Sequence, residues 1–160
     1  MESLYFDIVL FIYHLALALI VGGGIVLGSA TAPAIFRSVR SRGEAGSIFG
    51  AVLARWDGLA ILCVILLVVT SALRVGFEIT GEIEGRLIVR WIALAIVCIG
   101  VLYASAWASP VARAIRRQTP AWDDLPESAP ARIEFAKMHR ASTRGMQWAI
   151  LAGLVAMFFS

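Results

Sequence analysis

The chain has 160 residues and a formal net charge of +3 at pH 7, and 60% of its residues are hydrophobic while only 16% are charged. A water-soluble domain carries about 45–50% apolar and roughly 25% charged residues, so this composition excludes an ordinary soluble globular domain. The length suffices for one domain. The apolar residues gather in long blocks, and we therefore expect lipid to be the solvent for most of the chain.

The first apolar block covers about residues 4–36 and includes the run HLALALIVGGGIVLGSATAPAIFR. A signal peptide has a basic start and a cleavage site of small residues. This block instead begins with Glu2 and Asp7, and its one cleavage-like site is followed by Pro33. We therefore predict a retained helix that spans the membrane.

Small residues are concentrated in the middle of this block. In lipid, the close packing of small residues brings helices together, because the hydrophobic effect does not act between them. Gly24, Gly28 and Ala32 recur every four residues, and Gly22 widens the row. We predict that these four residues pack against another helix, either the third or fourth span or a helix of a second chain.

Three further apolar blocks follow at about residues 58–77, 91–109 and 131–159. The last begins as the amphipathic stretch RIEFAKMHRASTRG, whose long basic side chains can extend to lipid headgroups. The expected fold is therefore all-α, an integral membrane four-helix bundle that forms a single transmembrane domain over residues 1–160.

The connections between the blocks differ in charge. The first and third connections, with the adjoining helix ends, hold 11 of the 14 Lys and Arg residues. The positive-inside rule places them in the cytoplasm and both termini outside an inner or plasma membrane. We interpret the basic residues as a topology signal that also attracts anionic lipid. We expect no nucleic-acid partner, because no aromatic-lined basic domain accompanies them.

Two histidines, His14 and His139, are candidate functional residues. At 1.5 Å per helical residue they lie about 15 Å and about 30 Å from the outer surface, so they cannot share one metal or haem. We expect His14 to be neutral and hydrogen-bonded to a neighbouring helix, and His139 to lie at the cytoplasmic interface. The alternative is a haem or metal held by one histidine with other ligands, so the sequence leaves the cofactor unknown.

Glu44 and Arg113 are the other candidate polar residues. Glu44 lies in SRGEAGSIFG, where it is expected to be solvated or paired with an arginine, and Arg113 follows WASP, where it would anchor a helix at the headgroups. Arg74 is expected to pair with Glu78, one helical turn further on.

The sequence contains no pattern typical of an enzyme. It has no G-x-S-x-G, no P-loop and no dinucleotide-binding glycine pattern after a strand, and neither CxxC nor HExxH. We therefore expect a protein that is not an enzyme and has no dedicated metal site.

Four segments, HLALALIVGGGIVLGSATAPAIFR, GEAGSIFG, YASAWASPVARAIRR and RIEFAKMHRAST, together resemble a family of small four-span membrane proteins of unknown function. That family is typified by transmembrane protein 205 and is grouped with CopD-like copper-resistance membrane proteins. An asparagine common in the family before W..P is absent, since Ala104, Ser105 and Ala106 stand there. The resemblance implies a four-span fold and, for the wider group, copper handling. The residues that carry it are His14, Pro33, Phe36, Ala45, Gly46, Phe49, Trp107, Pro110, Phe135, His139 and Ser142.

The sequence favours a non-enzymatic accessory or scaffold subunit that packs against other membrane proteins or against itself, because small residues line its first span. A small-solute or metal-ion transporter, copper-like in the sense of the resemblance, is an alternative, and a haem or metal redox protein built around His14 is another. A transport path would have few polar residues: His14, Ser29, Thr31, Thr70, Ser71, Tyr103, Ser105 and Gln147.

Overall fold

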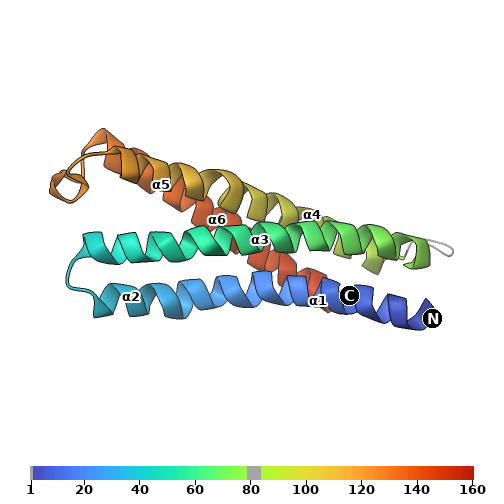
Figure 1. Ribbon diagram of the computed structural model, residues 1–160. Helices are drawn as coiled ribbons and strands as arrows, with labels where there is room; N and C mark the ends of the chain where they lie inside the picture. Colours follow the sequence, from blue (N-terminus) through green and yellow to red (C-terminus); the bar gives the residue numbers. More distant parts are fainter. Residues whose placement is uncertain (1, 79–83) are drawn as a thin grey trace.

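The computed structural model describes residues 2–78 and 84–160, and within these ranges every regular element is helical (Figure 1). The elements form four rods. The first rod is α1 (Glu2–Val26), the π-helical segment η1 (Leu27–Thr31) and α2 (Ala32–Ser38); the second is α3 (Arg42–Glu78); the third is α4 (Gly85–Val101), the π-helical segment η2 (Leu102–Ala108) and α5 (Ser109–Gln118); the fourth is α6 (Pro130–Phe158), preceded by the short 3-10 helix η3 (Trp122–Asp124).

Three of the rods are long and apolar enough to cross a membrane, namely Leu4–Ser38, Arg42–Gly76 and Gly85–Gln118. The prediction of an all-helical membrane protein is thus confirmed for the described residues. The helices extend beyond the apolar blocks of the sequence, because α3 begins at Arg42 and the block itself begins near residue 58. The third rod likewise continues through α5 instead of ending near residue 109.

The long α3 helix begins early because its first turn is capped. The Ser41 side-chain oxygen accepts a hydrogen bond from the backbone N–H of Glu44 at 3.1 Å. Such a cap satisfies one of the donors that a helix start leaves without a partner. What the sequence presents as a basic connection is therefore mostly the first four turns of α3.

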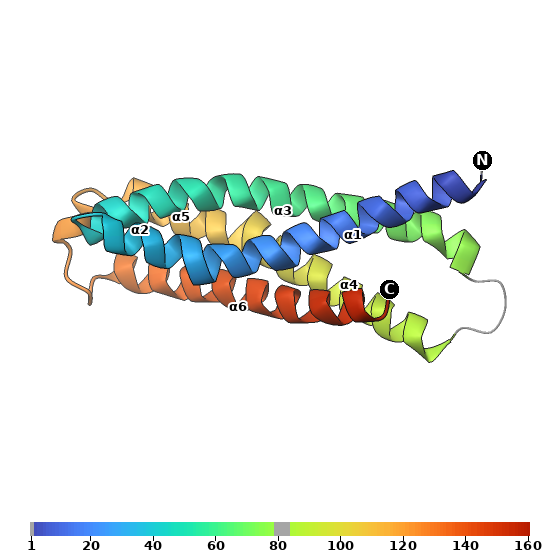
Figure 2. The ribbon, with the colours of Figure 1, turned by 90° about the horizontal axis from the view of Figure 1, so that it is seen from below.

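The rods run side by side, and both termini lie at one end of the bundle (Figures 1 and 2). α1 packs against α3 and α6, and α4 packs along α6. The core between them consists of apolar side chains from all four rods, among them Tyr13, Leu17, Ile20, Leu67, Val97, Val101 and Ala149.

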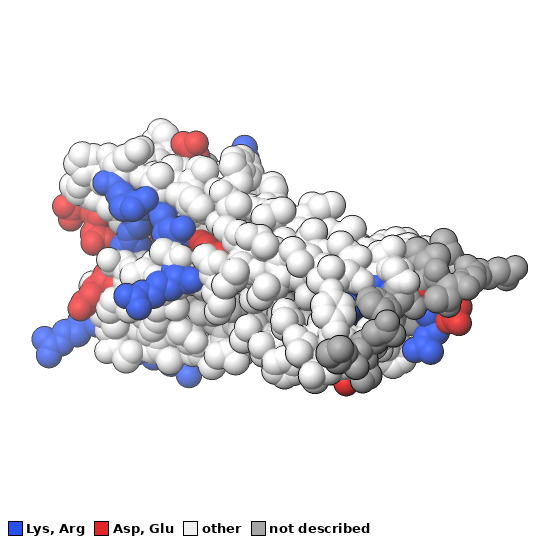
Figure 3. All heavy atoms as spheres, turned by 45° about the vertical axis from the view of Figure 1, so that its right-hand side comes forward, with Lys and Arg blue, Asp and Glu red and all other residues white. Residues whose placement is uncertain are grey.

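Charged side chains gather at the two ends of the bundle. Figure 3 shows most of them at the end away from the termini, and an uncharged belt covers the middle. Large apolar side chains are exposed on this belt, including those of Phe11, Ile65, Ile99 and Trp148. An apolar belt between charged ends is the surface that a bilayer requires.

The row of small residues on the first rod lies only in part at a helix contact. A Cβ added at Gly24 would lie 2.8 Å from Ile150 of α6, so this glycine allows a close approach. A Cβ added at Gly22 or Gly28 would meet no described atom within 4 Å. Both glycines are exposed, so neither packs closely against another described helix of this chain, and their packing against a second chain stays a prediction. The actual buried face of α1 is set by its large apolar residues.

α4 and α6 cross closely at a pair of glycines. A Cβ added at Gly100 would lie 2.7 Å from the carbonyl oxygen of Gly145, and one added at Gly145 would lie 3.1 Å from that of Gly100. The two backbones can approach this closely only because neither residue has a side chain. Sequence reasoning missed this pair, since each glycine stands alone among larger residues.

Candidate functional site

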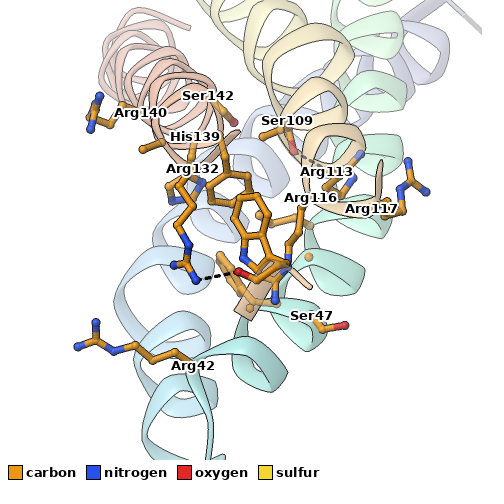
Figure 4. Close-up of a pocket in the computed structure, with 18 of the residues that line it drawn as sticks. Arg42, Ser47, Ser109, Arg113, Arg116, Arg117, Arg132, His139, Arg140 and Ser142 are labelled. Carbon is orange, nitrogen blue, oxygen red and sulfur yellow. Dashed lines mark hydrogen bonds between the residues drawn. The ribbon is translucent and has the colours of Figure 1, made fainter. Parts of the chain in front are cut away.

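A cavity of about 1010 Å³ opens at the end of the bundle away from the termini. It lies between α2 and α3 on one side and α5 and α6 on the other, with Trp122 of η3 in its wall (Figure 4). Its volume is at the upper end of the range of about 300–1,000 Å³ that is usual for ligand pockets. Its apolar lining includes Phe36, Phe49, Leu53, Ile133 and Phe135.

Two wide helical turns, each followed by a proline, precede the helices that form two of the walls. η1 is followed by Pro33 at the start of α2, and η2 is followed by Pro110 at the start of α5. Proline has no N–H for the helical ladder, and π-helical turns accommodate such a break. The two interruptions therefore set the direction of α2 and α5 where they border the cavity.

Six arginines and a single glutamate line the cavity. Arg116 of α5 donates to the carbonyl oxygen of Gly43 at 2.6 Å, and Arg132 of α6 donates to that of Trp122 at 2.9 Å. The Trp122 ring centre is 5.8 Å from the Arg116 guanidinium and 5.3 Å from that of Arg132. Figure 4 shows the side chains of Arg116 and Arg132 pointing toward the same part of the cavity, whereas those of Arg42 and Arg140 point away from it.

Arg116 fits against α3 because Gly46 leaves space there. A Cβ added at Gly46 would collide with the Arg116 guanidinium, so an alanine would displace this side chain. The short segment GEAG therefore supplies both a carbonyl acceptor and room for the arginine. Arg116 is the group that occupies the space beside Gly46.

Arg113 forms an ion pair with Asp57 of α3, which the sequence did not predict. Its Nη1 lies 2.5 Å from Asp57 Oδ2 and 2.6 Å from Ser109 Oγ. Ser109 also donates to Asp57 Oδ2 at 2.8 Å. Asp57 is only 5% exposed, and its negative charge offsets the positive charge of Arg113. Sequence reasoning missed Asp57, although an acid among apolar residues of a span is itself a signal.

His139 belongs to the wall of this cavity. Its ring stacks on Phe135 with centroids 5.9 Å apart and an interplanar angle of 4°, and Phe135 contacts Trp122 edge-on at 5.2 Å. The row of three rings gives the cavity an aromatic wall beside its arginines.

The family described as Domain of unknown function (DUF4149) matches residues 15–121 of this sequence. The chain belongs to this family. No curated protein and no solved structure matches the DUF4149 chain. The match includes Arg113 and Arg116 of α5 and ends before α6, so it covers three of the rods that line the cavity. It gives the family, and not the narrower transmembrane protein 205 or CopD-like type that the sequence resembles.

Glu44 of this DUF4149 protein lies outside the cavity lining. Its side chain is exposed on the first turn of α3, and its backbone N–H is the one that Ser41 caps. A carboxylate on the first turn of a helix interacts favourably with the helix dipole. The structure thus gives Glu44 a local role at the helix start.

His14 lies outside the cavity as well. Its Nδ1 is 2.9 Å from the carbonyl oxygen of Leu10, one turn earlier in α1, and its ring meets Tyr13 edge-on at 5.2 Å. The hydrogen bond is therefore within its own helix and not to the neighbouring helix that we expected. Among the described residues, no group of three or more His, Cys, Asp or Glu is placed to hold a metal ion.

A second buried charge cluster lies near the termini of the DUF4149 bundle. Arg74 Nε is 2.8 Å from Glu78 Oε1, as the sequence predicts, and Arg90 of α4 pairs with the same carboxylate. The Arg74 guanidinium also lies 4.4 Å from the centre of the Tyr13 ring. Arg74 and Arg90 are 4% and 6% exposed. This cluster joins α1, α3 and α4 at the end away from the cavity.

Proposed function

We propose that this DUF4149 protein is a four-span membrane protein that binds an anionic amphiphile in its arginine-lined cavity. The observation that carries this proposal is the convergence of Arg116 and Arg132 on one aromatic-walled space. A guanidinium presents a fork of donors that suits phosphate or carboxylate oxygens. The apolar part of the lining would hold the hydrocarbon of the same ligand.

The charge balance of the cavity supports an anionic ligand. Asp57 offsets one of the six arginines, and Glu127 is the single acid in the lining. Arg116 and Arg132 are bonded to neutral carbonyl groups, which leave their positive charges in place. Both are half-buried, so salt screens them less than it would screen free surface charges.

The same proposal includes an orientation. The basic end would face the cytoplasm and the termini the outside of an inner or plasma membrane, because the positive-inside rule governs such an excess of Lys and Arg. α6 would be the fourth span, since it packs along α4. The quoted motifs favour a protein of the transmembrane protein 205 type within DUF4149.

Binding of dodecyl phosphate to the protein in maltoside micelles tests the proposal. We expect this probe to raise the melting temperature of the wild type and to raise that of Arg116→Gln and Arg132→Gln much less. Arg37→Gln is the matched control, because Arg37 is exposed near the same end and outside the lining. Equal shifts in all four proteins would show that the probe acts as a charged detergent and does not use the cavity.

An accessory-subunit role is the second candidate. Gly22 and Gly28 are exposed with open space beside them, so another helix could approach the first rod there. A partner that co-purifies in mild detergent with the wild type and is lost from Gly28→Leu would support this role. Retention of the same partner by the variant would contradict it.

A further inference from the structure

We infer that the ligand is an anionic glycerophospholipid of the surrounding bilayer, which enters the cavity sideways between α2 and α6. This inference rests on the proposed function and names the source of the ligand. The phosphate would lie between Arg116 and Arg132, and at least one acyl chain would lie along the apolar lining toward the middle of the bundle.

The lining changes from charged to apolar along the helices. At the outer end of the cavity lie Arg42, Arg117 and Arg132, close to the ends of their helices. Deeper along the helices, the lining includes small or apolar residues such as Ala32 and Leu53. The two arginines of the lining at this depth are Arg113, which is paired with Asp57, and Arg140, which points away from the cavity. An amphiphile lying parallel to the helices, with its head at the end of the bundle, matches this gradient.

The helices α2 and α6 both border the cavity without packing extensively against each other, and we therefore place the entry between them. α2 packs against α3, whereas α6 packs against α1, α4 and α5. Phe36 of α2 and Ile133 of α6 both line the cavity, yet they are 48% and 56% exposed. Apolar side chains exposed at such an opening would be unfavourable in water and are suited to contact with an acyl chain.

The size of the cavity also favours a lipid over a small soluble anion. A volume of about 1010 Å³ is far larger than an inorganic phosphate or a glycerol phosphate needs. Such an anion would leave the aromatic wall of Trp122 and Phe135 exposed to water. A phospholipid would use both the arginines and this wall.

Native mass spectrometry of the purified protein can distinguish the sources of the anion. We expect the protein to retain dioleoyl phosphatidylglycerol and to lose dioleoyl phosphatidylcholine, and we expect glycerol phosphate to neither bind nor raise the melting temperature. Arg132→Gln should reduce phosphatidylglycerol retention about tenfold, as the loss of a charged hydrogen bond implies. Arg37→Gln should leave it unchanged.

The sideways path is tested by a variant that keeps every arginine. Ile133→Gln places a polar group on the apolar edge and should reduce phosphatidylglycerol retention several-fold. Ile65→Gln is its control, because Ile65 is 53% exposed on α3 and lies outside the cavity lining. Equal retention by both variants would overturn the sideways entry.

The remaining outcomes separate the two proposals. Binding of glycerol phosphate as tight as that of phosphatidylglycerol, or equal retention of phosphatidylcholine, would overturn the lipid inference and leave an anionic site in place. If neither dodecyl phosphate nor phosphatidylglycerol binds in an arginine-dependent manner, both the proposed function and this inference are wrong.

Discussion

Arg113 of α5 and Asp57 of α3 form an ion pair inside the bundle, with Nη1 of the arginine 2.5 Å from Oδ2 of the carboxylate. Ser109 donates to the same oxygen, so two side chains of α5 bind one carboxylate of α3. The pair lies beside the cavity and holds its α3 and α5 walls together. It thereby links the packing of the bundle to the shape of the candidate site.

Replacement of Asp57 by Asn should destabilise the protein by about 2–3 kcal/mol. Loss of one partner from a buried pair costs about 3–5 kcal/mol, and the partial exposure of Arg113 reduces this. Denaturation in mixed micelles would measure the change in the free energy of unfolding. Asp7→Asn is the control, because Asp7 is exposed on α1. The double variant Asp57→Asn/Arg113→Gln should be more stable than the sum of its single changes implies; strict additivity would contradict the pair.

Substitution of Gly100 by Leu should separate α4 from α6 and destabilise the bundle by about 1–3 kcal/mol or more, as overpacking does. The reason is the 2.7 Å approach of a Cβ at this position to the Gly145 carbonyl oxygen. Gly28→Leu is the matched control, because open space surrounds Gly28. Melting temperatures in detergent should fall for Gly100→Leu and stay constant or rise for Gly28→Leu. The reverse order would show that the crossing lies elsewhere.

Glu78→Gln should lower stability by about 3–5 kcal/mol, because it leaves the buried guanidinium groups of Arg74 and Arg90 without their shared carboxylate. Urea or mixed-micelle unfolding of the variant would measure this loss. Glu134→Gln, at an exposed position of α6, should have little effect. A similar small effect at Glu78 would mean that water or lipid replaces the carboxylate.

His14→Ala should cost less than about 1 kcal/mol, since the hydrogen bond that His14 makes is to Leu10 of its own helix. Tyr13→Ala should cost far more, because Tyr13 is fully buried and its ring contacts Arg74. The comparison is made by melting temperature. A larger effect at His14 than at Tyr13, or a lost absorption band in His14→Ala, would restore the cofactor hypothesis for His14.

Cysteines introduced at Asp7 and Ser128, in a Cys63→Ala/Cys98→Ala background, should react with a membrane-impermeant maleimide from opposite sides of the membrane. Asp7 is exposed near the amino terminus, and Ser128 is exposed in the loop before α6. Intact cells should label the cysteine at position 7, and inverted vesicles the one at position 128. Labelling of both from the same side would contradict the four-span topology.

The sequence by itself determined the helical class, the apolar character and the separation of charge along the chain. These are properties of composition and of local periodicity, which any fold of the chain must respect. The pairing of Arg74 with Glu78 was predictable for the same reason, because four residues along a helix set their separation. The early start of α3 is encoded locally as well, because the S-x-x-E pattern of Ser41 and Glu44 is typical of a helix start.

Only the tertiary structure decided which faces meet. Gly22, Gly24 and Gly28 look alike in the sequence, yet only Gly24 lies against another helix, because the rotation of each rod depends on all its neighbours. The sequence likewise does not predict the cavity. Arg116 and Arg132 are separated by a proline-containing loop and come together only because α5 and α6 pack side by side. Long-range packing selects one arrangement among several that the same hydrophobic pattern permits, and this selection places the arginines, the aromatic wall and Asp57 around one space.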